Sequence, residues 1–267
     1  MFRASTFFLS LMTALPLLSQ TPVISNSGVV NSVTGDSTQA VAPGSIVSIF
    51  GSQLASTTAT ADSVPLSTSI AGISVTFNGV ATPVRLVSPN LISVQVPWET
   101  DPTKPGSVVV TQNGVSSAAA SVAVAQYSPG LHAIQNLGRS NLALAVNSDG
   151  SLAQPTGIIP GLTTHPAQPG DTLMLLATGL GPVDSPISNG TASSDTVRNA
   201  LTQPQVTVSG IGATVASATL SASFVGAYQV QMTVPGGVGA SDAAPVQIQI
   251  GGFSSPATTT IAVASNQ

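Results

Sequence analysis

The chain has 267 residues, of which 42% are hydrophobic and only 5% are charged. This hydrophobic fraction is enough to bury a core, which excludes a disordered chain. Five Lys and Arg against nine Asp and Glu give a net charge of −4, and the cations are scattered along the chain. Nucleic acid and anionic membrane surfaces are therefore excluded as partners, because both require clustered positive charge.

The N-terminal sequence MFRASTFFLSLMTALPLLSQ has the pattern of a secretory signal peptide. One Arg precedes an apolar stretch, Phe7 to Leu18, and small and polar residues follow it. This stretch rises about 18 Å as a helix, too short for a hydrocarbon core of about 30 Å. We expect residues 1–19 to be a signal peptide and the mature chain to be exported to the periplasm, the cell surface or the medium. A buried N-terminal helix is the alternative.

Alternation of apolar and polar residues predicts strands along most of the mature chain. Residues 92–96 read ISVQV, residues 228–234 read YQVQMTV and residues 245–250 read PVQIQI. This period of two indicates sheets with one face on a core and one face in water. The Asn-Gly pairs at 78–79 and 113–114 are typical of two-residue hairpin turns. Short strands separated by frequent turns predict an all-β fold of antiparallel sandwiches.

Four blocks of sequence occur twice in the same order, which indicates a tandem duplication. Chance similarity of Ser-, Thr- and Val-rich sequence is the alternative. The paired blocks are APGSIVSIFGSQL (42–54) with QPGDTLMLLATGL (168–180), ISVTFNGVAT (73–82) with PQVTVSGIGAT (204–214), ISVQVP (92–97) with YQVQMTVP (228–235), and TQNGVSSAAASVAVA (111–125) with QIGGFSSPATTTIAVA (249–264).

The duplication predicts two tandem immunoglobulin-like β-sandwiches, at residues 22–126 and 168–265. Residues 127–167 are expected to be a linker that contains a β-hairpin, LALAVNSDGSLAQP, and a stiff Pro-rich run. We expect the hairpin to pack on the second sandwich. After signal cleavage no apolar run reaches about 18 residues, so no transmembrane segment is expected.

The chain resembles an uncharacterised C-terminal domain family described from Solibacter and other acidobacteria. The similarity lies in the order and spacing of VAPGSIVSIFGSQLA, ISVTFNGVATPVRLVSPNLISVQVPWE, NGVSS, ALAVNSDGSLAQP, PGDTLMLLATGLGPV and FVGAYQVQMTVPGGVGASDAAPVQIQIGG, and it covers residues 23–263. Each half is also similar, more loosely, to an IPT/TIG-type immunoglobulin-like module. Neither resemblance implies catalytic residues or an established activity.

The segment PWETDP holds the candidate ligand-binding residues Trp98, Glu99 and Asp101. An exposed indole at Trp98, the one Trp of the chain, would stack on a sugar ring, whereas a buried one would fill an interdomain seam. Glu99 and Asp101 are the one close acidic pair. Glycosidase chemistry, weak calcium binding and a plain surface loop all fit such a pair, and no Asp-x-Asp run supplies further calcium ligands.

Nucleophilic catalysis would need a His beside a Ser and an Asp, and the chain has two His, His132 and His165. Both lie in loop-like sequence, and no G-x-S-x-G motif is present. The chain has no Cys, which excludes disulfides and thiolate metal ligands. We predict no catalytic residues, no metal site and no cofactor.

These observations predict an exported, non-enzymatic structural or adhesive protein. The alternative function is a carbohydrate-binding module that uses Trp98 and the adjacent loops, and a hydrolase assembled from distant loops is a third hypothesis. A surface polysaccharide or another exported protein is the expected partner. The oligomeric state stays open.

Overall fold

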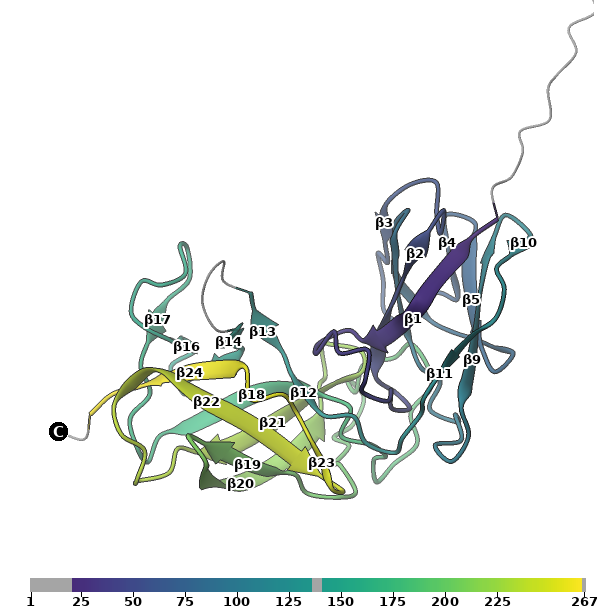
Figure 1. The fold of residues 1–267 in the computed structure, drawn as a ribbon. Coiled ribbons are helices and arrows are strands. Elements are labelled where there is room, and N and C mark those ends of the chain that lie inside the picture. Colours follow the sequence, from purple (N-terminus) through teal and green to yellow (C-terminus); the bar gives the residue numbers. More distant parts are fainter. Residues whose placement is uncertain (1–20, 136–140, 266–267) are drawn as a thin grey trace, which may run out of the picture.

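The computed structural model describes residues 21–135 and 141–265, so the expected signal peptide lies outside the described residues. The described chain forms strands and loops and contains no helix, hence none that is long and apolar enough to cross a membrane. Figure 1 shows two β-sandwiches, the first in purple to blue and the second in teal to yellow. The predicted all-β fold class of two tandem sandwiches is confirmed.

The first sandwich consists of two antiparallel sheets. One has the strand order β1-β2-β8-β7-β3, and the other has the order β10-β9-β5-β4, with β11 on β9 and β6 on β5. Their inner faces meet in a core that includes Ile49, Phe77 and Val94. The strands are β1 (Val23–Asn31), β2 (Ile46–Ser52), β3 (Ala59–Thr60), β4 (Ser69–Ile70), β5 (Ile73–Phe77), β6 (Val80–Ala81), β7 (Val84–Val87), β8 (Leu91–Gln95), β9 (Gly106–Gln112), β10 (Val115–Ser116) and β11 (Ala120–Val122).

The second sandwich is one continuous path of hydrogen-bonded strands, β13-β14-β24-β22-β19-β20-β21-β18-β15-β16-β17. The long strands β20 and β22 each pair with β19 along one part and with β21 or β24 along the other, which closes the two layers over a core. The strands are β12 (Gly130–Leu131), β13 (Ala133–Ile134), β14 (Asn141–Ala143), β15 (Ala145–Val146), β16 (Leu152–Ala153), β17 (Thr164–His165), β18 (Thr172–Thr178), β19 (Gln205–Val208), β20 (Ile211–Leu220), β21 (Ala227–Thr233), β22 (Ser241–Ile250), β23 (Phe253–Ser254) and β24 (Thr259–Val263).

Strand pairing repeats between the two sandwiches as the duplicated sequence blocks predict. The pair β2–β8 corresponds to β18–β21, the pair β5–β9 corresponds to β19–β22, and β10 and β11 on β9 correspond to β23 and β24 on β22. The isolated parallel bridge Val41↔Val124 also has a counterpart, Ala167↔Val263. Shared topology in the same order supports duplication over chance similarity.

The Pro-Gly turn that opens each repeat makes the same hydrogen bond in both sandwiches. The N–H of Gly44 donates to the carbonyl of Val96 at 2.9 Å, and the N–H of Gly170 donates to the carbonyl of Val234 at 2.9 Å. The turn therefore ties the start of one strand to the end of its partner in each repeat.

Residues 127–167, expected to be a linker, are built into the second sandwich. The predicted hairpin is present as β15–β16, and both β12 and β15 pair with the same edge of β18. In the first sandwich β1 covers the corresponding edge of β2. Without β12 and β15 the edge of β18 would expose unpaired backbone groups, which explains why the segment packs there and does not act as a spacer.

Candidate functional site

The segment PWETDP lies at the junction of the two sandwiches. Trp98 is half-buried and packs against the core of the second sandwich. Its six-membered ring lies on the backbone of Gly44, so closely that a side chain at Gly44 would overlap it. The indole Nε1 is buried and has no hydrogen-bond partner in the described chain. Trp98 is therefore placed as interdomain packing and not as an open stacking platform.

A loop of the second sandwich closes over this junction through Asn189 and Gly190. The side-chain oxygen of Asn189 accepts a hydrogen bond from the backbone N–H of Trp98 at 2.9 Å. The Asn189 Nδ2 donates to Oε2 of Glu99, also at 2.9 Å. The carbonyl of Gly190 accepts from the N–H of Leu66 at 2.8 Å. We call Asn189 and Gly190 the clasp.

The clasp also reaches a buried side chain of strand β8. The N–H of Gly190 donates to Oε1 of Gln95 at 2.6 Å, and Nε2 of Gln95 donates to the Gly44 carbonyl at 3.0 Å. The alternation in ISVQV predicted that Gln95 faces water, but the residue is fully buried. The second sandwich covers this face of β8, and a buried amide is stable there because both of its ends are hydrogen-bonded.

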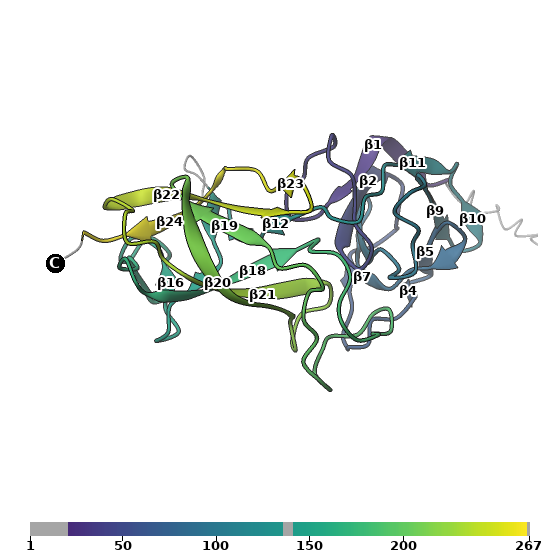
Figure 2. The same ribbon diagram turned by 90° about the horizontal axis from the view of Figure 1, so that it is seen from below.

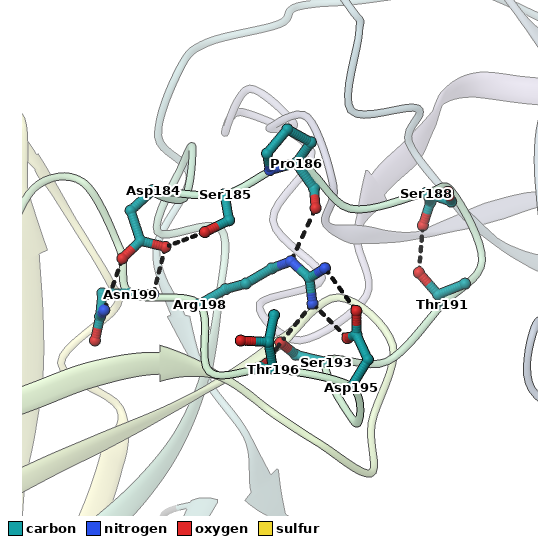
Figure 3. Close-up of polar contacts among 10 residues, drawn as sticks. All are labelled: Asp184, Ser185, Pro186, Ser188, Thr191, Ser193, Asp195, Thr196, Arg198 and Asn199. Atoms are coloured by element: carbon teal, nitrogen blue, oxygen red, sulfur yellow. Dashed lines mark hydrogen bonds and ion pairs between the residues drawn. The ribbon is translucent and has the colours of Figure 1, made fainter.

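The loop that carries the clasp, residues 183–200, is ordered by the buried side chain of Arg198 (Figure 3). Its guanidinium binds Asp195 with two hydrogen bonds of 2.6 and 3.0 Å and donates through Nε to the carbonyl of Pro186 at 2.9 Å. The Arg198 guanidinium holds the pKa of Asp195 down, at about 2. At the base of the loop Asn199 donates to Asp184 at 2.7 Å. A charged side chain therefore fixes a loop that has no strand pairing across the junction.

Glu99 and Asp101 lie on the outer side of the junction and line a shallow pocket of about 390 Å³. Asp101 accepts from the hydroxyl of Thr103 at 2.6 Å and pairs with Lys104 at 2.9 Å. These hydrogen bonds hold the pKa of Asp101 well below its usual range. Among the described residues no group of three His, Cys, Asp or Glu side chains is arranged to hold a metal ion.

His165 contacts an Asp, but not in the order that a hydrolase needs. Its Nε2 lies 2.9 Å from Oδ2 of Asp149, and its Nδ1 lies 3.0 Å from the carbonyl of Pro166. Both ring nitrogens face acceptors, and the Pro166 carbonyl and the Asp149 carboxylate raise the pKa of His165. Ser151 donates to the same Asp149 at 2.7 Å. Asp149 therefore lies between Ser151 and His165, and neither ring nitrogen is hydrogen-bonded to the Ser151 hydroxyl.

His132 lies at the wall of a groove between the sandwiches, which Asp62 and Ser63 also line. Its ring forms no hydrogen bond to a Ser or an Asp among the described residues. Burial, together with the nearby charge of Arg85, lowers the pKa of His132 to about 4, so the ring is neutral at pH 7. Neither His is placed to activate a Ser among the described residues.

Sequence reasoning missed the clasp and the role of Arg198. Asn189-Gly190-Thr191 has the form of a glycosylation sequon, yet the Asn189 side-chain nitrogen is used in the hydrogen bond to Glu99. The available signal was the Asn-Gly pair itself, which favours a turn with positive φ, and φ of Gly190 is 79°. Nothing in the sequence showed that this turn faces the other domain.

Comparison with known proteins agrees with the fold. Residues 29–127, which include most of the first sandwich, match the family model of the IPT/TIG domain. No curated protein matches the chain. Among solved structures, the crystal structure of the I9-I11 tandem from titin matches over 92% of this chain and 67% of that chain, with 11% sequence identity and a TM-score of 0.23.

The chain is therefore a protein of two tandem immunoglobulin-like sandwiches, the first of which matches the IPT/TIG domain. This class indicates a non-enzymatic β-sandwich module.

Proposed function

We propose that this protein is an exported structural or adhesive module of the cell surface, the periplasm or the extracellular matrix, in which the two sandwiches act as one rigid unit. The observation that carries the proposal is the clasp. A flexible tandem would have a solvated junction, whereas here Gly190 is bound to buried Gln95 and Trp98 fills the seam. Export rests on the N-terminal sequence pattern of residues 1–19.

Cell fractionation tests the export part of the proposal. The full chain and a variant without residues 1–19 are expressed in a Gram-negative host with a C-terminal tag. We expect the full chain in the periplasm or outside the cell, shortened at its N-terminus, and the truncated variant in the cytoplasm. Equal cytoplasmic retention of both would contradict export. Binding of cells to surfaces coated with the purified mature chain then tests adhesion.

Carbohydrate binding is the alternative function, and the pocket beside Glu99 and Asp101 favours it. Carboxylates that are already hydrogen-bonded can still accept hydrogen bonds from sugar hydroxyls. The test is depletion of the mature protein by insoluble and soluble polysaccharides, with and without calcium. Retention that is lost in Glu99→Gln and Asp101→Asn would support this function. Trp98→Ala is less informative here, because it also alters the domain junction.

A further inference from the structure

A groove of about 700 Å³ runs between the two sandwiches. The first sandwich supplies residues 60–64 and 85–86, and the second supplies His132, Leu176 and residues 223–225. Grooves at domain interfaces are preferred places for ligands, because two surfaces can contact one molecule. The clasp fixes the two walls relative to each other, so the groove is preformed.

The rim of the groove exposes large apolar side chains. Val64 on one wall is 52% exposed, and Phe224 on the other is 58% exposed. Leu86, Leu144 and Leu176 line the interior. Apolar groups gathered on a concave surface are typical of a binding site.

Arg85 is the cation of this groove, and no described acidic side chain pairs with it. All nine Asp and Glu of the chain lie within the described residues. The other two described cations are paired, Lys104 with Asp101 and Arg198 with Asp195. An exposed guanidinium beside apolar walls favours a carboxylate that arrives with an apolar ligand.

The remaining charged and titratable groups of the groove are His132 and Asp62. His132 is neutral at pH 7 and does not compete for a carboxylate. Asp62 is exposed and lies beyond ion-pair distance of Arg85. Asp62 would weakly repel an anionic ligand. Replacing Asp62 should therefore tighten binding of such a ligand, whereas replacing Arg85 should weaken it.

One wall of the groove is also an open sheet edge. β3 is the outermost strand of its sheet and pairs only with β7. Directly after β3, the N–H of Ala61 donates to the carbonyl of Arg85 in β7 at 2.8 Å, so the pairing with β7 extends by one residue. The N–H groups of residues 62–64 have no hydrogen-bond partner in the described chain. An open edge beside a groove can accept an added strand.

We propose that this groove binds an extended, apolar peptide segment of a partner protein, that the segment lies along β3 and residues 61–64, and that one of its carboxylates pairs with Arg85. The inference deepens the proposed adhesive function, on which it rests, by naming the class of partner. The peptide contributes main-chain hydrogen bonds to the open edge, and the apolar walls cover its alternate side chains.

The test uses the purified mature chain and fluorescein-labelled peptides of sequence Thr-Val-Thr-Glu-Val-Thr-Val, with matched peptides that carry Gln or Lys in place of Glu. Fluorescence anisotropy measures affinity. We expect the Glu peptide to bind about tenfold more tightly than the Gln peptide, since a charge-assisted pair is lost. Arg85→Gln should abolish this preference, and Asp62→Asn should tighten binding of the Glu peptide by about twofold.

Lys104→Gln is the matched control, because it removes a cation that lies outside the groove and should leave all affinities unchanged. Thermal unfolding verifies that Arg85→Gln is folded. Equal affinity for the three peptides, preference for Lys, or absence of binding would each overturn the inference. Binding of decanoate in isothermal titration calorimetry, without binding of the Glu peptide, would also overturn it, in favour of a fatty acid ligand.

The two proposals fail separately. A protein that adheres to cells but does not bind the Glu peptide would overturn the inference about the groove and leave the adhesive function standing. Peptide binding by a protein that is neither exported nor adhesive would overturn the proposed function alone.

Discussion

The backbone N–H of Gly190 donates a hydrogen bond to the fully buried side-chain oxygen of Gln95 at 2.6 Å. This bond joins a loop of the second sandwich to β8, the middle strand of one sheet of the first sandwich. In Figure 2, as in Figure 1, one end of the second sandwich lies against the first. Because the acceptor is buried and its other end is bound to Gly44, the contact fixes both the position and the orientation of the loop.

Gly190→Ala should separate the two sandwiches. Gly190 has a φ of 79°, and an added Cβ would lie 2.9 Å from the carbonyl oxygen of Leu66. Gly210 has the same φ of 79° but no atom within 4 Å of the added Cβ, so Gly210→Ala is a matched control. We expect backbone strain of about 1 kcal/mol in both variants and about 2 kcal/mol more in Gly190→Ala.

Urea unfolding measures these free energies, and small-angle scattering and proteolysis of residues 183–200 report domain separation. Equal effects of Gly190→Ala and Gly210→Ala on all three measurements would contradict the role of the clasp.

Trp98→Ala should lower the free energy of unfolding by about 2–4 kcal/mol, because it leaves a cavity in the interdomain seam. Trp98→Phe should cost less, since it keeps an aromatic ring in the seam and removes the buried Nε1 that has no partner in the described chain. Differential scanning calorimetry measures both variants. An unchanged transition in Trp98→Ala would show that the ring does not couple the sandwiches.

Arg198→Met should loosen the loop of residues 183–200 and weaken the clasp. The buried guanidinium binds Asp195 and the Pro186 carbonyl, and Met keeps the apolar stem without these bonds. We expect a loss of about 1–3 kcal/mol and a faster cut within the loop by protease. NMR titration should show the pKa of Asp195 rising from about 2 toward its ordinary value of 3.8. An unshifted pKa would contradict the ion pair.

Ser117 and Ser255 occupy equivalent positions in the two repeats, and loss of either hydroxyl should lower the free energy of unfolding by a similar amount. Oγ of Ser117 accepts from the Val110 N–H at 3.1 Å, and Oγ of Ser255 accepts from the Ile248 N–H at 3.1 Å. Ser117→Ala and Ser255→Ala each leave a strand N–H without this acceptor and should each cost about 1–2 kcal/mol. Ser116→Ala, at an exposed site, should stay within about 0.5 kcal/mol. Urea unfolding of the three variants decides this, and a large effect in one sandwich alone would argue against equivalence.

Stability should fall as the pH is lowered from 6.5 to 4, because of His132. Burial lowers its folded-state pKa to about 4 from the ordinary value of 6.5, so the unfolded chain binds the extra proton in this window. The loss reaches at most about 3 kcal/mol. His132→Leu should flatten the profile between pH 6.5 and 4 in urea unfolding.

The pKa of His165 is shifted in the opposite direction from that of His132, so His165 serves as the control. Its folded-state pKa is raised, so its contribution is present at low pH and is lost as the pH rises through that raised pKa. His165→Gln should therefore leave the loss below pH 6.5 in place. A profile that is flattened by His165→Gln and not by His132→Leu would reverse the two assignments.

Much of the fold followed from the sequence, because the signals that specify it are local. Period-two runs such as Ile92 to Val96 indicate strands without reference to the rest of the chain, and positive φ at Asn-Gly pairs indicates turns. The duplicated blocks then predicted two sandwiches of the same kind. Residues 127–167 were predicted to be a linker because the repeat was recognised only from its Pro-Gly turn onward. The strands β12 and β15, which precede this turn in the second repeat, have little sequence in common with β1.

The candidate site depended on contacts between residues far apart in the sequence. Trp98, Glu99 and Asp101 were identified as a group, but the partner of the first two, Asn189, is 90 residues or more away. A single strand shows which of its faces is apolar. It does not show what covers the other face, so the burial of Gln95 could not be predicted from the sequence.

The sequence by itself therefore determined the strand pattern, the duplication and the near absence of charge. The tertiary structure alone decided that the sandwiches are clasped, that the Trp98 ring fills the seam, and that Arg85 lies in a groove without an acidic partner among the described residues. The physical reason is that strand periodicity is a property of neighbouring residues, whereas a seam or a groove is formed by side chains from two domains that meet only in the folded chain.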